Sequence, residues 1–341
     1  MKQSKDFALL VEGYFTEYLL KERGASQHTI RSYRDTFVLL LEYLFSVKRL
    51  PPEKVRMEIM NKDLVLSFLD WLEVERHVTV RTRNQRYAVL RSFFKYLMYE
   101  DPVHLYQWKL ASSMKEKRGP SRTLSYLTPD GISLIFKQVD TSTRLGRRDL
   151  ALLSTLYNTG ARVSELVALT PSSIRQSKPY IIELYGKGSK KRIVPVDEDV
   201  IALLNKYMEE NNLSGRGHED APLFPNPWGE RLTTPGVSYI VHKYGVPART
   251  VAPDLIPERI SPHVFRHSRA MHLLQAGVNI VYIRDILGHV SIQTTEVYAR
   301  ADSRHKREAL EKAYEEIGVT EPEMKSWEKD KKLKSFLKSL A

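Results

Sequence analysis

The stretch SPHVFRHS, residues 261–268, places His263 and Arg266 three positions apart. Ser261 and Pro262 favour the first turn of a helix, so the pattern predicts a helix that begins here and carries both side chains on one face. An imidazole and a guanidinium on one face can both point at a single phosphate group. Because a histidine and an arginine at this spacing are common by chance, the interpretation depends on the neighbouring strings.

Two strings on the C-terminal side add a nucleophile and a second imidazole. ILGHVS (286–291) contains His289, and TTEVYAR (294–300) contains Tyr298, nine residues further on. A tyrosine hydroxyl has a reference pKa of about 10, so it needs a proton acceptor when it attacks. Because an imidazole titrates near neutral pH, we expect His263 to take this proton while His289 donates a hydrogen bond to the phosphate.

Upstream, NTGARVSEL (158–166) supplies a second guanidinium. Arg162 is followed three residues later by Glu165. This spacing is about one helical turn, at which a carboxylate can hold a guanidinium in place. We therefore expect an oriented Arg162, with Glu165 in a supporting role.

A lysine lies in YGKGSKKR (185–192), between two apolar runs at 180–184 and 193–196. This pattern predicts a β-hairpin whose tip carries Lys187 between two glycines. A hairpin tip can bring a proton donor into a cleft, and we expect Lys187 to protonate the leaving oxygen. The alternative is that Lys187 is one of several exposed basic residues of this hairpin, beside Lys190, Lys191 and Arg192.

These residues together can attack a phosphodiester without a metal or another cofactor. Fixed guanidinium groups stabilise the charge that builds on the phosphate oxygens, and a phosphotyrosine conserves the energy of the broken bond. A zinc site at His263 and His267 is the competing interpretation, but the glutamate of such a helix is missing and Arg266 would repel the cation. The expected catalytic residues are Tyr298, Arg162, Lys187, His263, Arg266 and His289, with no metal.

In these strings the chain resembles the tyrosine recombinase family, which includes phage integrases and Xer-type recombinases. The matching strings are TGARVSEL, GKGSKKR, HVFRH and LGH, with the tyrosine nine residues after the last histidine. The resemblance implies DNA cleavage through a 3′-phosphotyrosyl bond, strand exchange through a Holliday junction, and four protomers on paired DNA sites. It also implies a two-domain clamp, in which a helical core-binding domain and a catalytic domain close on the duplex.

Composition is consistent with that family. The chain has 341 residues, enough for two domains, and a formal net charge of +12, which favours a polyanionic partner such as nucleic acid. The absence of cysteine excludes disulfide and thiolate chemistry and suits a reducing cytosol. No apolar run approaches the roughly 20 residues that span a bilayer, and no signal peptide is recognisable. We therefore expect a cytoplasmic protein with no membrane partner.

The N-terminal part of the sequence has four helical patterns, at 6–22, 29–45, 61–74 and 79–99. Between Arg76 and Tyr99 there are six basic residues and no acidic residue. Solvated helix faces usually carry both signs, so this imbalance indicates contact with phosphates. The expected DNA-binding residues are Arg31, Arg34, Arg81, Arg83, Arg86, Arg91 and Lys95, with Lys190, Lys191 and Arg192 on the hairpin. The apolar residues of the fourth helix are expected in the core: Tyr87, Leu90, Phe93, Phe94 and Leu97.

The expected fold class is mainly α with a small antiparallel β-sheet. Helical periodicity is lost at 100–127 and at 211–236, where proline, glycine and polar residues interrupt it. Further helices are expected at 147–169 (with a break at 158–160), 199–210, 237–244, 262–276, 279–287 and 291–299. The expected domains are 1–110, a helical SAM-like core-binding domain; 111–124, a basic linker; 125–318, the catalytic domain; and 319–341, an amphipathic tail.

The end of the chain predicts a helix at 303–317 and an amphipathic helix at 325–340. The apolar stripe of the second has no obvious place in its own domain, so we expect it to dock on a neighbouring protomer, with packing in cis as the alternative. This tail and the 211–236 segment favour a recombinase of a mobile element, acting in integration, excision or transposition, over Xer-type resolution of chromosome dimers. Accessory DNA-bending or regulatory proteins are further expected partners.

Two other functions could use part of the same pattern. A type IB topoisomerase uses related residues but relaxes supercoils as a monomer and needs no paired sites. A DNA-binding protein that had lost catalysis would lack some of the catalytic groups, whereas all six are present here. The GKGSKKR hairpin and the C-terminal tail weaken the topoisomerase alternative, and the complete catalytic set weakens the non-catalytic one.

Overall fold

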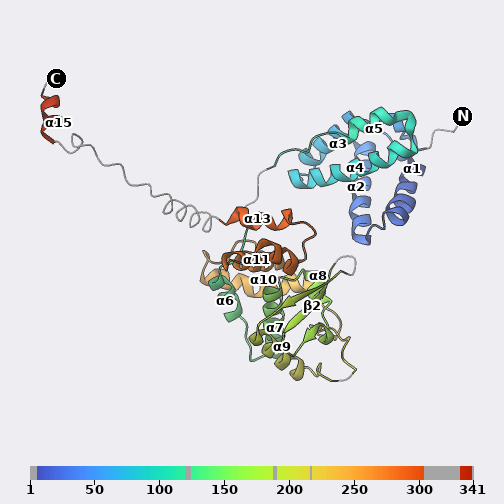
Figure 1. Ribbon diagram of the computed structural model, residues 1–341. Helices are drawn as coiled ribbons and strands as arrows, with labels where there is room; N and C mark the ends of the chain where they lie inside the picture. The colour runs from blue at the N-terminus through green and yellow to red at the C-terminus, as the bar shows by residue number, and fades with distance from the viewer. Residues whose placement is uncertain (1–5, 120–123, 187–189, 216, 303–330, 340–341) are drawn as a thin grey trace. The chain divides into compact units, whose positions relative to one another are not determined.

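The computed structural model describes residues 6–119, 124–186, 190–215, 217–302 and 331–339. The chain divides into two compact units, Met1–Arg122 and Thr123–Ala341 (Figure 1). Most of the described residues are helical, and the strands form one small antiparallel sheet. This confirms the predicted fold class. Across the described ranges, no helix is long and apolar enough to cross a membrane.

The N-terminal unit, where the structure describes it, is helical. Its elements are α1 (Phe7–Gly13), which continues as the π-helical segment η1 (Tyr14–Glu22), then α2 (Gln27–Ser46), the short 3₁₀ helices η2 (Pro52–Lys54) and η3 (Met57–Ile59), α3 (Lys62–Val74), α4 (Val80–Glu100), η4 (Pro102–His104) and α5 (Leu105–Ser112). The side chains of Ser26, Asn61 and Thr79 cap α2, α3 and α4 by accepting a backbone N–H of the first turn. The four predicted helices of this region are confirmed.

Aromatic rings fill the core of this unit. Phe93 makes edge contacts with Tyr14 and with Phe37, each with ring centroids 5.1 Å apart. All the apolar residues of α4 that were expected in the core are buried: Tyr87, Leu90, Phe93, Phe94 and Leu97. One face of α4 thus holds the unit together, which leaves its other face for the basic side chains.

Helix α5 lies where the sequence predicted irregular chain, so that prediction was wrong. Trp108 of α5 is fully buried and stacks on Phe94, with ring centroids 5.8 Å apart. The hydroxyl of Tyr87 donates a hydrogen bond to the carbonyl of Ala111 at 3.1 Å. This helix of eight residues is stabilised by packing on α4, and tertiary contacts of this kind do not register as periodicity.

The C-terminal unit alternates helices with the sheet. Its elements are α6 (Pro129–Lys137), α7 (Arg144–Thr159), α8 (Val163–Val167), η5 (Pro171–Ser173), β1 (Ile174–Arg175), β2 (Ile181–Tyr185), β3 (Lys191–Pro195), α9 (Glu198–Glu210), α10 (Thr234–Val251), α11 (Pro262–Gln275), α12 (Ile280–Leu287), α13 (Gln293–Ala301) and α15 (Lys331–Lys338). The helix pair around the 158–160 break is α7 and α8. The predicted helix at 237–244 is longer than expected, because α10 continues through Pro247.

The sheet has the order β1-β2-β3, and both strand pairs are antiparallel. Strands β2 and β3 form the predicted hairpin, with Tyr185 opposite Lys191 and Leu184 opposite Arg192. Because opposed residues of a strand pair lie on the same face, Arg192 shares a face with the buried Leu184. The hairpin therefore turns one of its basic residues toward the interior.

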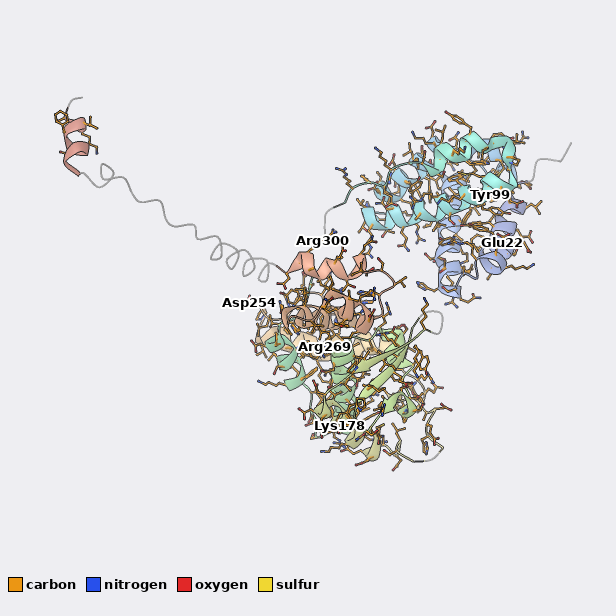
Figure 2. All side chains as sticks on the ribbon, viewed as in Figure 1. Glu22, Tyr99, Lys178, Asp254, Arg269 and Arg300 are labelled. Atoms are coloured by element: carbon orange, nitrogen blue, oxygen red, sulfur yellow. The ribbon has the colours of Figure 1, made fainter. Side chains whose placement is uncertain are left out.

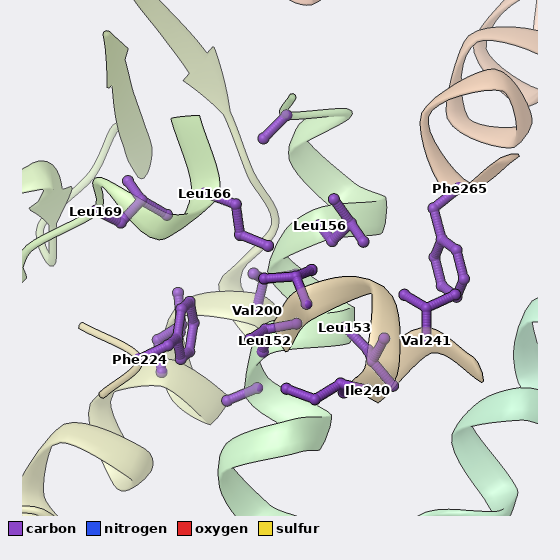
Figure 3. Packing of buried hydrophobic residues seen from close by; sticks show 14 of the residues in the cluster. Leu152, Leu153, Leu156, Leu166, Leu169, Val200, Phe224, Ile240, Val241 and Phe265 are labelled. Carbon is purple, nitrogen blue, oxygen red and sulfur yellow. The ribbon is translucent and has the colours of Figure 1, made fainter. Parts of the chain in front are cut away.

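The core of the C-terminal unit brings five helices together. Figure 3 shows Leu152, Leu153 and Leu156 of α7 in one cluster with side chains of α8, α9, α10 and α11. Figure 2 labels Arg269, which lies on α11. Its guanidinium carbon lies 5.7 Å from the ring centroid of Tyr157. A smaller cluster joins α11, α12 and α13, and its members include Met271, Ile283, Leu287 and Tyr298. These two clusters fix the elements that carry the site.

The tail predictions lie mostly outside the described residues. The helix expected at 303–317 and most of the helix expected at 325–340 are among them, and only α15 represents the second. In α15, Phe336 and Leu337 are each 58% exposed.

Candidate active site

Glu165 holds Arg162 in a fixed orientation. Helix α7 ends at Gly160, whose φ of +56° is the left-handed conformation that glycine adopts without strain, and Arg162 then stands at the N-terminus of α8. The Glu165 carboxylate accepts hydrogen bonds from the Arg162 backbone N–H through Oε2 and from Arg162 Nη1 through Oε1, both at 2.7 Å. The spacing-based prediction that Glu165 holds this arginine is confirmed.

Arg192 shares the same carboxylate. Its Nη1 lies 2.6 Å from Glu165 Oε1, and Glu165 is only 2% exposed. Burial alone would raise the pKa of Glu165, but hydrogen bonds and charge from Arg192 and Arg162 outweigh it and lower the pKa below its ordinary value. The carboxylate is therefore ionised at neutral pH and joins β3 to α8.

Arg266 lies on α11 and is almost completely buried, with 4% of its surface exposed. Its Nη1 donates to the carbonyl of Gly160 at 2.6 Å. Burial and the charges of Arg162 and Arg192 lower the pKa of Arg266 to about 10, which leaves it charged at neutral pH. Such a cation cannot turn toward water, so its direction is set by the protein.

The guanidinium groups of Arg162, Arg192 and Arg266 all donate hydrogen bonds to the C-terminus of α12. Helix C-termini present unpaired carbonyls with partial negative charge, and here three consecutive carbonyls each accept from a different arginine. The pairs are Arg192 Nε to Ile286 O at 2.8 Å, Arg266 Nη2 to Leu287 O at 2.6 Å, and Arg162 Nη2 to Gly288 O at 2.8 Å. One helix end thus orients three cations from β3, α11 and the start of α8.

Gly288 is the residue that permits this convergence. Its φ is +64°, and a Cβ there would lie 2.9 Å from Cδ of Arg192. Any other residue would strain the backbone and press on that arginine. The LGH string therefore has a structural reason for its glycine.

Tyr298, on α13, points inward in this structure. It is 3% exposed, and its hydroxyl lies 3.0 Å from Nδ1 of His267. Its ring stacks on that of His289, with centroids 6.2 Å apart and 12° between the planes. Burial raises the pKa of Tyr298, while the charges of Arg266 and Arg162 act to lower it. The hydroxyl is thus a neutral group near two cations.

His289 follows Gly288 and is oriented by Thr295. Its Nδ1 lies 2.8 Å from Thr295 Oγ1, and Thr295 is fully buried. Burial first, then the charges of Arg266 and Arg162, lower the pKa of His289 to about 4. The imidazole is therefore neutral at pH 7, and a neutral ring can donate only one N–H.

His263 stands at the start of α11 and is exposed. Two hollows meet at Arg162: one is also lined by Glu165, Arg192 and His289, and the other by Ser261 and His263. Partial burial and the charges of Arg266 and Arg162 lower the pKa of His263. The surface around Arg162 can therefore receive an anion between the two histidines.

The basic residues of the hairpin differ in their exposure and in their partners. Lys187 lies outside the described residues, although a Cβ on the preceding Gly186 would lie 3.2 Å from Glu165 Oε1. Lys190 is exposed and lines the hollow beside Arg162, whereas Lys191 pairs with Glu183 across the strands at 2.7 Å. The alternation of the strand turns Arg192 inward to Glu165. The DNA contact predicted for Arg192 stays a prediction.

The basic residues of α2 and α4 divide into free-standing and partnered side chains. Arg31, Arg81 and Lys95 are exposed, and Arg34 is exposed but paired with Asp35 at 2.8 Å. Arg81 also lines a hollow with Thr79, Asn84 and Gln85 of the same unit. These side chains remain available to a polyanion.

The other three members of that set have partners within the unit. Arg83 is 7% exposed, and its Nε lies 2.9 Å from Glu73 of α3. The carboxylate that pairs with Arg83 thus comes from another helix, and the DNA contact predicted for Arg83 stays a prediction. Arg86 donates to the carbonyl of Ser32 and to Thr36 Oγ1, both at 3.0 Å, and Arg91 lies 3.6 Å from Glu116.

Two members of this site were not assigned to it from the sequence. His267 was expected to be either structural or a support to the catalytic residues rather than a metal ligand, and Thr295 was not singled out. The signals existed: His267 is one helical turn after His263, and Thr295 is three residues before Tyr298 on the same helix. Neither signal identifies which atom each side chain meets.

Two parts of the chain match models of known protein families. Residues 125–305 match the phage integrase family, and residues 13–101 match the phage integrase N-terminal SAM-like domain. The chain belongs to the phage integrase family. It is therefore a tyrosine-type site-specific recombinase, as the motifs predicted.

Individual relatives extend over most of this recombinase. It is 35% identical to the "Putative integrase/recombinase y4rC" of Sinorhizobium fredii over 100% of both chains. It is 31% identical to the "Tyrosine recombinase XerC" of Thermodesulfovibrio yellowstonii over 88% of this chain and 94% of the relative. Among solved structures, the XerH site-specific recombinase in a post-cleavage complex with a palindromic difH substrate aligns with a TM-score of 0.69. That alignment covers 87% of this chain and 83% of the other at 20% identity, which supports the fold.

Proposed function

We propose that this recombinase cuts and rejoins double-stranded DNA at specific sites through a 3′-phosphotyrosyl bond to Tyr298. The observation that carries the proposal is the convergence of Arg162 and Arg266 on the end of α12, beside His289, whose ring stacks on Tyr298. Cations fixed in advance stabilise a phosphoryl transition state without reorganising. Family membership supports the same reaction class.

In this proposal the two guanidinium groups bind the non-bridging phosphate oxygens. Arg162 keeps one side of its guanidinium on Glu165 and Gly288, and Arg266 is fixed by Gly160 and Leu287. Charge that grows on the phosphate oxygens during attack is then met by two oriented cations. Glu165 supports the reaction by orienting Arg162.

Protons move through the histidines and Lys187. His263, exposed at the rim beside Arg162, accepts the phenol proton as Tyr298 attacks. His289, neutral at pH 7, donates its free N–H to the phosphate, since Nδ1 is engaged with Thr295. Lys187 protonates the leaving 5′ oxygen, and the close approach of Gly186 to Glu165 supports its loop as the source of this acid.

The proposed reaction uses no cofactor. The phosphotyrosyl bond conserves the energy of the cleaved phosphodiester, so rejoining needs no ATP, and the catalytic set contains protein groups only. In this scheme the energetic cost of each cut is returned when the 5′ hydroxyl of the partner strand attacks.

Duplex DNA is the proposed partner of both units. The exposed Arg31, Arg81 and Lys95 of the N-terminal unit and Lys190 of the hairpin would bind its phosphates. We propose the domain limits given above, with residues 111–124 as a basic linker, and a cytoplasmic location where the chain meets the genome.

Assembly and biological role complete the proposal. Four protomers would hold two sites and exchange strands through a Holliday junction, with α15 docking its exposed Phe336 and Leu337 on a neighbour. We propose a mobile-element role in integration, excision or transposition, aided by accessory DNA-bending or regulatory proteins. The relative matched over 100% of both chains has integrase/recombinase in its name, which is compatible with a role in integration.

The test is recovery of covalently attached DNA. Wild type and Tyr298→Phe are expressed in a bacterial host carrying the chain's native flanking DNA, non-covalent complexes are stripped with detergent, and the attached DNA is sequenced after protease digestion. Tyr157→Phe is the matched control, because the hydroxyl of Tyr157, a half-buried tyrosine, is also paired with a histidine, His272, at 2.8 Å. Discrete sites from wild type and the control alone would support the proposal, and equal recovery from Tyr298→Phe would refute it.

A further inference from the structure

The hydroxyl of Tyr298 is hydrogen-bonded to His267, which is not one of the proposed catalytic residues. It lies 3.0 Å from Nδ1 of His267, and Tyr298 is absent from the residues that line either hollow beside Arg162. With 3% of Tyr298 exposed, the oxygen that is proposed to attack DNA is enclosed by protein. It must leave this position before it can reach a phosphate.

His267 has the properties of an acceptor rather than a base. Burial, together with His263 and Arg266, lowers the pKa of His267 to about 4, so the ring is neutral at pH 7. In the neutral tautomer that carries its proton on Nε2, Nδ1 accepts the phenol hydrogen. A base whose pKa lies this far below the operating pH would be poorly matched to remove a phenol proton.

The surroundings of the pair favour a defined resting position. Tyr298 belongs to the small core cluster with Met271, Ile283 and Leu287, and its ring is stacked on His289. The hydrogen bond to His267 adds direction to this packing, because an apolar cluster alone does not select the rotation of the phenol group. Helix α11 thus holds both a proposed catalytic arginine and the partner of the nucleophile.

We infer that His267 is a positioning residue, which holds the Tyr298 hydroxyl in a buried resting position through Nδ1, and that release of this hydrogen bond precedes attack. The inference rests on the proposed role of Tyr298 as the nucleophile. A buried hydrogen bond contributes about 1 kcal/mol, which corresponds to a change of about 5-fold in the population of the released hydroxyl.

Two substitutions of His267 distinguish loss of the hydrogen bond to Tyr298 from loss of the ring that fills this position. His267→Phe keeps a ring but has no acceptor, whereas His267→Asn places an amide oxygen close to where Nδ1 lies. His272→Phe is the control, because it breaks the comparable bond between His272 and Tyr157 in the same unit.

The first measurement is nitration of the peptide containing Tyr298 by tetranitromethane, without DNA, in the folded full-length chain. We expect nitration about 5-fold faster in His267→Phe and unchanged in His267→Asn and in His272→Phe. An unchanged rate in His267→Phe, or an equal rise in the Tyr157 peptide, would overturn the inference, since the second result indicates general loosening.

A second measurement does not need His267→Phe and therefore tests the inference even if that variant fails to fold. Nitrogen-15 spectra of the histidine rings report whether Nδ1 accepts a hydrogen bond, and Tyr298→Phe removes only the hydroxyl. We expect the His267 Nδ1 signal to shift in Tyr298→Phe and to stay constant in Tyr157→Phe. No shift in Tyr298→Phe would overturn the inference.

Covalent attachment in the bacterial host tests the order of steps. Early recovery of attached DNA should rise about 5-fold in His267→Phe and return to the wild-type level in His267→Asn. Lower recovery in His267→Phe, restored by Asn, would overturn the resting role and make His267 a direct partner in attack. The nitration and nitrogen-15 measurements use no DNA, so their failure is separate from failure of Tyr298 as the nucleophile.

Discussion

Arg192 and Glu165 are joined by an ion pair of 2.6 Å between Nη1 and Oε1, which ties the hairpin strand β3 to helix α8. The carboxylate is 2% exposed and also holds Arg162. The strand that leads away from the proposed acid Lys187 and the helix that begins at a proposed phosphate ligand are therefore one mechanical unit.

Replacing Arg192 by Gln should cost about 3 kcal/mol of unfolding free energy, because the substitution leaves part of a buried charge uncompensated. Urea unfolding at pH 7 measures the loss. Lys191→Gln is the matched control, since it breaks the neighbouring but solvent-exposed pair with Glu183 and should cost much less than the Arg192 substitution. Equal losses in the two variants would show that the Arg192 pair contributes no more than a surface pair.

Gly288→Ala should lower stability by about 2 to 3 kcal/mol, because it adds backbone strain and a contact with Arg192. Gly277→Ala provides the comparison, since Gly277 also has a positive φ, +80°, but nothing within 4 Å of the added Cβ. That variant should lose about 1 kcal/mol. If thermal unfolding gave the same loss for both, the close approach to Arg192 would carry no cost.

Arg162→Lys and Arg266→Lys should each reduce the rate of covalent DNA attachment by about 10² to 10³, because an ammonium group cannot keep two fixed donors and still face a phosphate. Binding of the recovered DNA site should stay within a few fold, measured by gel shift. Arg144→Lys is the control, because Arg144 donates a hydrogen bond to Asn211 and takes no part in the proposed site. It should change neither the attachment rate nor the binding. A loss of binding equal to the loss of attachment would assign the arginines to affinity alone.

Stability should fall as the pH is lowered from about 6.5 toward 4. The folded chain lowers the pKa of His289 and of His267 to about 4, while the unfolded chain has ordinary histidines near 6.5. In this interval the unfolded state binds more protons, so protonation favours unfolding, and no such contribution exists above pH 6.5. His289→Gln should flatten the decline in urea unfolding between pH 7 and pH 5, and the exposed His218→Gln should not. An identical slope in wild type and His289→Gln would contradict the buried neutral state.

Sequence patterns predicted the elements with strong periodicity and the residues with strong chemistry. The helix begun by Ser261 and Pro262, the hairpin at 180–196 and the Arg162–Glu165 pair all follow from spacing within one element. Helix α5 and the inward turn of Arg192 depend on contacts between elements. Local periodicity carries no record of such contacts.

The DNA-binding expectations show the same limit. The charge imbalance of α4 is real in the sequence, but Arg83 is neutralised by Glu73 from another helix. Counting charges within one element could not reveal this partner. The alternation of β3, with Arg192 two residues before the buried Val194, was the one local signal that could have placed that arginine inside.

The acceptors that orient the three arginines are main-chain carbonyls of residues 286–288. Every amino acid carries a carbonyl, so changes of side chain at Ile286 or Leu287 leave the acceptors in place as long as α12 keeps its end. Substitutions on the outer face of α12 can therefore accumulate without disturbing the cations. Gly288 is the exception among these three residues, because its positive φ and its contact with Arg192 leave no room for a side chain.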